Sequence, residues 1–239
     1  MNSIEGQQER VLRTFTTLYS LRQDWGGSLI VAAGLNPRGA ALALASNIAG
    51  AVCLSVEDDP ARIREVIRSG VCDFIVNTLD EALRTIKNEI RKHLPLSVGL
   101  QADPILILDE LFERGVSPDV FAILSDCAAT SKAAKRFQSL GSLVLDFEGS
   151  NADQDVFHLN MQLGAFLQNH QWYLESFTLE TSSALRAFDA NAMSLLNEQD
   201  QLRRAWLRAA PRILQRERPL RRVLWLTAEE KRTLEGMSA

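Results

Sequence analysis

"VAAGLNPRGAALALASNIAGAVCLSVEDDPARI" spans residues 31–63 and holds an apolar run, a glycine-bounded turn, an alanine-rich stretch and a second apolar run that ends in acidic residues. This order is typical of the first strand, turn, helix and second strand of a dinucleotide-binding fold. Residues 39–56 carry no charge, but Ser46, Asn47 and Gly50 interrupt them. They therefore predict a buried helix followed by a buried strand, and not a membrane span.

The turn departs from the usual three-glycine pattern at its centre. Gly34 and Gly39 occupy the first and third glycine positions, whereas Asn36 stands at the second and Pro37 removes a backbone N–H. Arg38 adds a cation at the helix start, where free amides and the helix dipole favour anions. We expect Gly34, Asn36, Arg38 and Gly39 to contact a nucleotide or a small anionic ligand, at a pyrophosphate site that is either abolished or reshaped.

An acidic residue follows the second apolar run at the position where dinucleotide-binding folds use a carboxylate. Glu57 stands 23 positions after Gly34, close to the spacing of roughly 20 at which such a carboxylate meets a ribose hydroxyl. The sequence therefore predicts that Glu57 takes part in cofactor binding.

Short apolar stretches alternate with helical patterns over the first 148 residues. This rhythm predicts a doubly wound α/β fold, with a mostly parallel Rossmann-like sheet behind an N-terminal helix. Asp59 before Pro60 and Asp103 before Pro104 predict helix starts. The expected strands lie at 28–33, 51–56, 72–76, 96–100, 119–124 and 142–146, and the expected helices at 6–22, 38–49, 60–69, 79–93, 104–114 and 129–140.

The strand pattern fades from about residue 150, and the remaining sequence is compatible with long helices. We expect three units, an N-terminal helix (1–22), a Rossmann-like domain (23–148) and an all-helical C-terminal region (149–239). The last is rich in arginine between residues 203 and 222. Such a region suits a homodimer or a partner protein held through the C-terminal helices.

The composition argues against several classes of protein, namely nucleic-acid-binding, secreted and metal-binding proteins. The chain has 239 residues and a net charge of −4, which argues against a general affinity for nucleic acid. The first ten residues lack the basic and apolar zones of a secretory signal, so we expect a cytoplasmic protein without a membrane segment. Three cysteines and three histidines show no metal-ligand spacing, and we expect no metal.

The same stretch resembles the central domain of urocanase, the urocanate hydratase of histidine breakdown. The resemblance covers about residues 23–126. It is carried by "VAAGL", "AGAVCLSVEDDPARI", "LDEALRTI", "PLSVGL", "ELFERGVSPDV" and "SD", in the order and approximate spacing of that family.

The resemblance implies a Rossmann-like domain and an NAD that acts as an electrophile in a hydratase (lyase) reaction. It implies that Glu57 and Arg62 contact the ribose and phosphate, and that Asp103 and Asp126 lie where the family has further cofactor contacts. This sequence departs from the pattern at Asn36 and Pro37, where the family has glycines, and at Asp103, where the family has an asparagine. The resemblance transfers no catalytic residue to this chain.

Three functions stay open at this level. The first is a urocanase-related protein with a degenerate dinucleotide-binding domain, whose NAD binding is weak or lost and which lacks hydratase activity by itself. The second is an NAD-dependent hydratase completed by a partner chain, for which the C-terminal region offers His158, His170, Tyr173 and Glu175. The third is a noncatalytic interaction or scaffold protein that uses its C-terminal region.

Overall fold

A computed structural model gives the fold of residues 6–125, 127–149, 156–214 and 218–238. The strands are β1 (Leu29–Ala33), β2 (Val52–Glu57), β3 (Phe74–Val76), β4 (Leu96–Gln101), β5 (Val120–Ile123), β6 (Leu143–Asp146), β7 (Val156–His158), β8 (Tyr173–Thr178) and β9 (Arg221–Leu226). The helices are α1 (Gln7–Leu21), α2 (Pro37–Ala49), α3 (Pro60–Ser69), α4 (Leu79–Lys92), α5 (Pro104–Glu113), α6 (Ala128–Ser139), α7 (Leu159–His170), α8 (Ser182–Leu195), α9 (Gln201–Ile213) and α10 (Ala228–Ser238).

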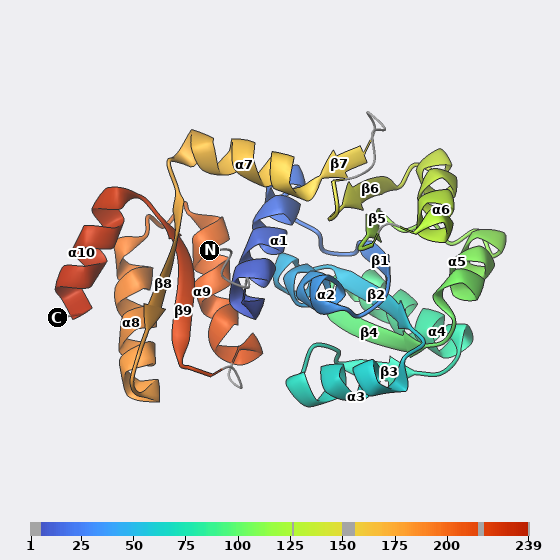
Figure 1. Cartoon of the computed structure of the whole chain (residues 1–239), viewed down its shortest axis with the longest axis horizontal. Coiled ribbons are helices and arrows are strands. Elements are labelled where there is room, and N and C mark those ends of the chain that lie inside the picture. The colour runs from blue at the N-terminus through green and yellow to red at the C-terminus, as the bar shows by residue number, and fades with distance from the viewer. Residues whose placement is uncertain (1–5, 126, 150–155, 215–217, 239) are drawn as a thin grey trace.

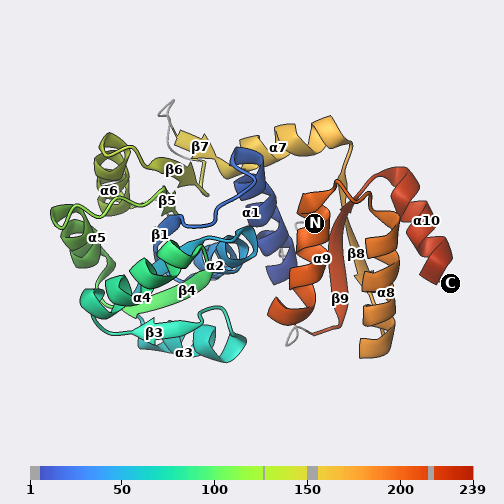
Figure 2. The ribbon, with the colours of Figure 1, turned by 180° about the vertical axis from the view of Figure 1, so that it is seen from behind.

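Strands β1 to β7 form one sheet in the order β3-β4-β2-β1-β5-β6-β7. Every neighbouring pair in it is parallel. The core divides into two clusters, one with side chains of α1, α2 and α3 and the other with side chains of α4, α5 and α6. Figures 1 and 2 show these helices on either side of the sheet. The doubly wound α/β fold that the alternation predicts is therefore confirmed.

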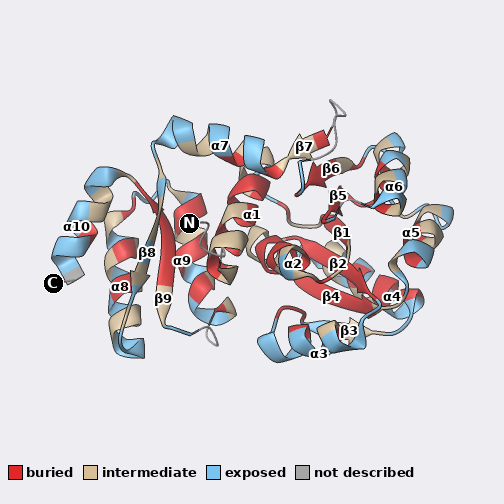
Figure 3. Ribbon diagram, viewed as in Figure 1, coloured by how far each residue is buried: buried red, intermediate tan, exposed pale blue. Residues whose placement is uncertain are grey.

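Strand β1 shows why the sheet must be covered on both faces. Leu29 and Val31 belong to one core cluster, and Ile30 and Ala32 belong to the other. All four side chains are buried. A strand that is apolar on both faces is stable only between two helical layers, which is the arrangement that Figure 3 shows for the centre of the sheet.

Most predicted element bounds agree with the structure to within one or two residues. The helix starts at Pro60 and Pro104 are confirmed, because Asp59 accepts one backbone amide and Asp103 accepts two in the first turn of the helix that follows each of them. The uncharged run of residues 39–56 forms most of α2 and β2, as expected. Over the described residues, no helix combines the length and the apolar character that crossing a bilayer requires.

The C-terminal region is mainly helical, but the expectation that it contains helices alone is wrong. Strand β7 extends the main sheet beside β6, and β8 pairs with β9 in a separate antiparallel sheet. The side chains of β9 from Arg222 to Leu226 are buried. A buried backbone needs hydrogen-bond partners, and β8 provides them along one edge of β9.

The other edge of β9 is covered by side chains of α1 and α9. The Gln8 amide donates to the carbonyl of Arg221 (2.9 Å) and accepts from the N–H of Val223 (3.1 Å), as a neighbouring strand would. The indole of Trp206 donates to the Val223 carbonyl (2.7 Å), and Arg203 donates to the Trp225 carbonyl (3.1 Å). This edge is therefore closed to further strands, and α1 joins the C-terminal region to the sheet domain.

Replacement of Gln8 tests this closure. Gln8→Leu leaves the buried N–H of Val223 without its acceptor and removes the donor to the part-buried carbonyl of Arg221. A buried group that is left unsatisfied costs about 1–3 kcal/mol. We expect the free energy of unfolding, measured by urea denaturation, to fall by at least that amount. The control Gln7→Leu changes the half-buried neighbour of Gln8 and should alter it by less than about 0.5 kcal/mol. Equal effects of the two changes would contradict the role of Gln8.

Candidate functional site

The strand order places the candidate site at the carboxyl ends of β1 and β5. Strand β1 lies between β2 and β5, so the chain reverses its direction of progress across the sheet at this strand. The helices that follow β1 and β5 belong to opposite faces. Open α/β sheets bind their ligands in the crevice that such a reversal creates, and the predicted turn residues lie there.

The two glycines of the turn keep the backbone frame of a dinucleotide-binding fold. Gly34 has a φ of +108°, a conformation that L side chains rarely adopt. A Cβ atom at Gly39 would lie 2.3 Å from the Gly34 carbonyl oxygen and 3.0 Å from the Leu124 side chain. Glycine at position 39 thus permits the close approach of α2 to the end of β1, as the fold requires.

Asn36 caps α2 with its own side chain. Its Oδ1 accepts the backbone amides of Arg38 and Gly39, each at 3.0 Å, and its carbonyl accepts the amide of Ala40 at 2.9 Å. Pro37, the first helical residue, has no N–H to offer. The amides that would otherwise hold a phosphate at the start of α2 are therefore bonded within the chain.

Glu57 is buried and also bonded to the backbone. One carboxylate oxygen accepts the amide of Leu35 (2.8 Å) and the other accepts the amide of Asp59 (3.1 Å). Arg62 lies 3.8 Å from the first of these oxygens. Only 7% of Glu57 is exposed. The sequence spacing predicts that the Glu57 carboxylate binds a ribose. In the structure, this carboxylate links the turn that follows β1 to the turn that follows β2.

Arg38 crosses the crevice between β1 and β5. Its guanidinium donates to the carbonyl of Leu124, just after β5 (3.2 Å), and pairs with the carboxylate of Glu148 beyond β6. Asp146 at the end of β6 accepts the Glu148 amide (2.7 Å) and so fixes the loop that carries this carboxylate. The side chain expected to attract an anion therefore spans the place where a dinucleotide would lie.

The two remaining predicted site residues do not join this group. Asp103 is exposed and caps α5, where it accepts the amides of Ile105 (2.8 Å) and Leu106 (3.4 Å). It follows β4, which is two strands away from β1, a separation of about 10 Å. Asp126 lies outside the described residues.

The residues at the switch point do not fit NAD in the usual position. The pyrophosphate would need amides that Asn36 already bonds, and the ribose would need a carboxylate that Leu35 and Asp59 already occupy. A hollow beside α2 and α3, with Pro37 and Arg62 in its wall, has a volume of about 140 Å³. It is therefore smaller than most small-molecule sites, which measure about 300–1,000 Å³.

The comparison with known families agrees with the fold. A model of the urocanase Rossmann-like domain matches residues 4–146. The chain belongs to the urocanase family. The match is wider than the residues that carry the sequence resemblance, because it includes α1 and ends at the last residue of β6. The urocanase-like domain thus contains the whole switch point, and β7 to α10 lie beyond the match.

The four C-terminal candidates for catalysis do not form one site. His158 lies 3.6 Å from the buried Asp146 at the edge of the sheet, whereas His170 packs against the rings of Phe166 and Trp172. His158 is the N-cap of α7 and His170 is its last residue, so the length of the helix, about 18 Å, separates them. The other two candidates lie on β8, where Tyr173 is exposed and Glu175 pairs with Lys231.

The buried arginines of the C-terminal region form ion pairs within the chain. Arg203 forms ion pairs with Asp200 and Glu230. Burial by itself would raise the pKa of the Glu230 carboxyl, but the hydrogen bonds from Arg203 and Thr227 outweigh it, and this pKa is lowered. In the same way Arg222 bonds Asp189. These guanidinium groups are therefore paired within the C-terminal region itself.

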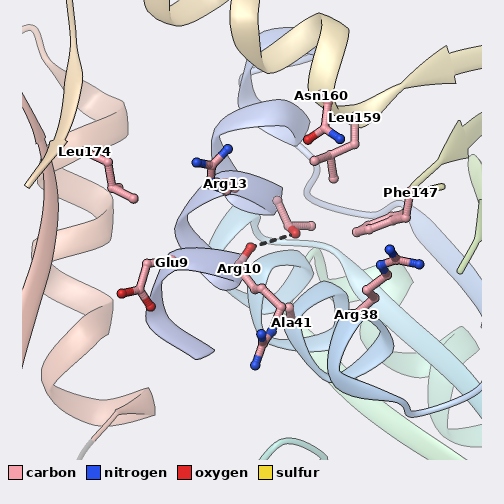
Figure 4. Close-up of a pocket in the computed structure, with 10 residues that line it drawn as sticks. Glu9, Arg10, Arg13, Arg38, Ala41, Phe147, Leu159, Asn160 and Leu174 are labelled. Carbon is pink, nitrogen blue, oxygen red and sulfur yellow. Dashed lines mark hydrogen bonds between the residues drawn. The ribbon is translucent and has the colours of Figure 1, made fainter. Parts of the chain in front are cut away.

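A larger cavity lies beside the switch point and was not expected from the sequence. It has a volume of about 460 Å³ and is bounded by α1, α2, α7 and β8. Figure 4 shows the side chains around it. Arg10, Arg13 and Arg38 contribute its cationic wall, and Phe147, Leu159 and Leu174 contribute apolar surface. We refer to this space as the arginine cavity.

The described histidine, cysteine and acidic side chains do not form a metal site, and two of the three cysteines are buried. Over the described ranges, His, Cys, Asp and Glu side chains do not gather in groups of three or more that could hold a metal ion. Burial raises the thiol pKa of Cys53 to about 11. Burial, together with the neighbouring Cys53 and Asp73, raises that of Cys72 to about 12. Cys127 is exposed.

Gly39→Ala tests the close approach of α2 to β1. Alanine stabilises an ordinary helix by about 0.5–1 kcal/mol relative to glycine, but here its Cβ meets backbone. We expect a loss of about 1–3 kcal/mol in the free energy of unfolding. The control Gly164→Ala, within α7, has nothing within 4 Å of its new Cβ and should be stabilising. A stabilised Gly39→Ala variant would contradict this role of the glycine.

Thiol labelling tests the cysteine environments. Because the raised pKa values keep Cys53 and Cys72 protonated, a disulfide reagent at about pH 8 should modify one thiol per native chain and three after denaturation. Cys127→Ser should remove the native reaction. Rapid modification of two or more thiols in the native protein would show that the buried pair is accessible.

Proposed function

We propose that this chain is a urocanase-family protein whose Rossmann-like domain keeps the fold but has a degenerate NAD site, and that it does not hydrate urocanate by itself. The observation that carries the proposal is the cap on α2, in which Asn36 takes the amides of Arg38 and Gly39. A phosphate would have to displace that side chain and would recover one N–H fewer, because of Pro37.

Two further contacts support the same conclusion. The carboxylate of Glu57 would have to give up two backbone amides before it could accept ribose hydroxyls. The amide of Leu35 is buried, and leaving such a group without a partner costs about 1–3 kcal/mol. The guanidinium of Arg38 would have to leave Glu148 and Leu124 before a dinucleotide could cross the crevice.

The alternatives draw less support. A hydratase completed by a partner chain would need reacting groups placed together, but His158 and His170 flank α7 at opposite ends. An interaction protein would need a free C-terminal surface, whereas Trp206, Trp225 and Phe188 are buried within this chain. Sedimentation of a stable dimer would favour the interaction protein.

NAD titration tests the proposal. We expect no NAD in the denatured extract of the purified chain and no saturable heat with NAD, and no loss of urocanate absorbance when urocanate and NAD are supplied. Asn36→Gly/Pro37→Gly restores the glycines of the family pattern and frees the amides of α2, so this variant should bind NAD more tightly than the natural chain.

A matched control separates this effect from a general loosening of helix starts. Asp103→Gly/Pro104→Gly opens the equivalent cap on α5, which lies away from the switch point. It should leave the response to NAD unchanged. Copurified NAD, a dissociation constant below about 100 μM for the natural chain, or turnover of urocanate by the chain alone would refute the proposal.

A further inference from the structure

We propose that the free edge of β8 pairs with β8 of a second copy of this chain and so forms a weak, symmetric dimer. The sequence predicts a dimer held through the C-terminal helices, whereas this contact is made by a strand. Strand β8 lies beyond the matched urocanase-like domain, and the inference does not rest on the state of the NAD site.

The pairing of β8 with β9 leaves alternate backbone groups of β8 pointing away from β9. In an antiparallel pair, two opposite residues either bond each other or both point outward. The backbone groups of Arg221 and Val223 point outward from β9, because they bond Gln8. Their partners on β8, at every second position, therefore point outward on the opposite side; these are Leu174, Ser176 and Thr178.

These outward groups face solvent at an open edge. In the described part of the chain, the two-stranded sheet ends at β8, and the backbone groups of these three residues bond no other element. Ser176 and Thr178 are exposed, and Tyr173 at the start of the strand is 61% exposed. Figures 1 and 2 show α8 on one face of this sheet and α9 on the other. The helices thus cover its faces and leave the backbone of β8 available.

Strand β8 lacks the features that usually protect a sheet edge. Proteins block such edges with proline, lysine, bulges or very short strands. The outer strands of the main sheet, β3 and β7, have three residues each, whereas β8 has six and contains neither Pro nor Lys. The opposite edge of the same sheet is closed by side chains of α1 and α9. An open edge of this length is a template for another strand.

The sequence of β8 suits pairing with a second copy of itself. If Ser176 lies opposite Ser176 of the second copy, the outward groups of the two strands match, with Leu174 opposite Thr178. Glu175, the charged residue of β8, then lies opposite Phe177. A register centred on Glu175 would instead place two carboxylates opposite each other, which is unfavourable. The register centred on Ser176 therefore pairs most of the strand without charge repulsion.

The dimer should be weak, because little apolar surface is left to bury. Trp206, Trp225 and Phe188 are buried within their own chain, so the contact consists mainly of one strand edge. Interfaces of this small size are typical of transient association. We expect a dissociation constant between about 10 μM and about 500 μM.

Sedimentation velocity between about 5 μM and about 1 mM protein tests the proposal. We expect the sedimentation coefficient to rise from the monomer value toward the dimer value. Amide hydrogen exchange over the same range locates the contact. Exchange at Ser176 and Thr178 should slow as the dimer forms, whereas exchange at Glu175 and Phe177, whose amides already face β9, should not change.

Charge changes at Ser176 test the register. Ser176→Lys and Ser176→Glu each place like charges opposite each other in the dimer, so each variant alone should associate about fivefold more weakly than the natural chain. An equimolar mixture of the two variants should recover the natural affinity, because the central pair then has opposite charges. The controls Gln168→Lys and Gln168→Glu make the same charge changes at an exposed position of α7 and should have no effect.

A second pair of variants separates the backbone from the side chain. Ser176→Pro removes an N–H that faces solvent in the monomer, a place where edge strands tolerate proline. Self-association should therefore weaken by more than about tenfold while the fold is kept. Ser176→Val keeps the N–H and should keep the dimer.

Four outcomes would overturn the proposal. The first is a monomer at every concentration up to about 1 mM. The second is a dimer that the Lys, Glu and Pro changes at Ser176 leave unaltered. The third is slow exchange at Ser176 and Thr178 in the dilute monomer, which would show that another segment of the chain covers the edge. The fourth is a dimer that persists at nanomolar concentration, which would require a larger interface. None of these variants alters the cap on α2, so NAD titration of each separates this inference from the proposed function.

Discussion

The Asn36 side chain accepts two backbone amides at the first turn of α2 with a single oxygen, and this cap constrains the centre of the molecule. It fixes where α2 begins, and so allows Gly39 to approach the Gly34 carbonyl and lets Arg38 reach the carbonyl of Leu124. The same contact takes up two amides that a pyrophosphate would use at the start of this helix. In the function that we propose, the stability of the turn and the loss of the pyrophosphate site therefore have one cause.

Helix α1 is the second constraint, because it links the two parts of the chain. It packs against α2 and also contacts β9. Gln8 closes the edge of β9, and Thr16 accepts the indole N–H of Trp225 (2.8 Å). Arg10 and Arg13 of the same helix line the arginine cavity. The arginine cavity thus lies between the urocanase-like domain and the C-terminal region, and both contribute to its wall.

The sequence predicts the sheet well because its signals there are local. Apolar runs bounded by Gly, Pro or Asp mark the parallel strands, and an Asp before a Pro marks the starts of α3 and α5. Asn36 followed by Pro37 is the same kind of signal, so the sequence also indicates a cap on α2. Comparison with the glycine pattern alone shows only that the Asn36 side chain takes up space, and does not show that it accepts the amides of Arg38 and Gly39.

The features that could not be predicted depend on contacts between distant residues. The region beyond residue 150 is compatible with helix throughout. Strand β9 instead pairs with β8 along one edge and meets Gln8, more than 200 positions away in the sequence, along the other. Glu57 has the spacing of a ribose ligand, but its acceptors are satisfied by Leu35 and Asp59 once the turns fold. The arginine cavity likewise combines α1, α2, α7 and β8, and no sequence spacing relates these elements.

Backbone amide NMR of the natural chain, with and without saturating NAD, tests most directly whether the start of α2 is closed. If Asn36 holds the amides of Arg38 and Gly39, their resonances should stay where they are as NAD is added, and their hydrogen exchange should stay slow. Saturable shifts confined to residues 34–39, with a matching change at Glu57, would show that a pyrophosphate displaces the cap, and would contradict the central claim.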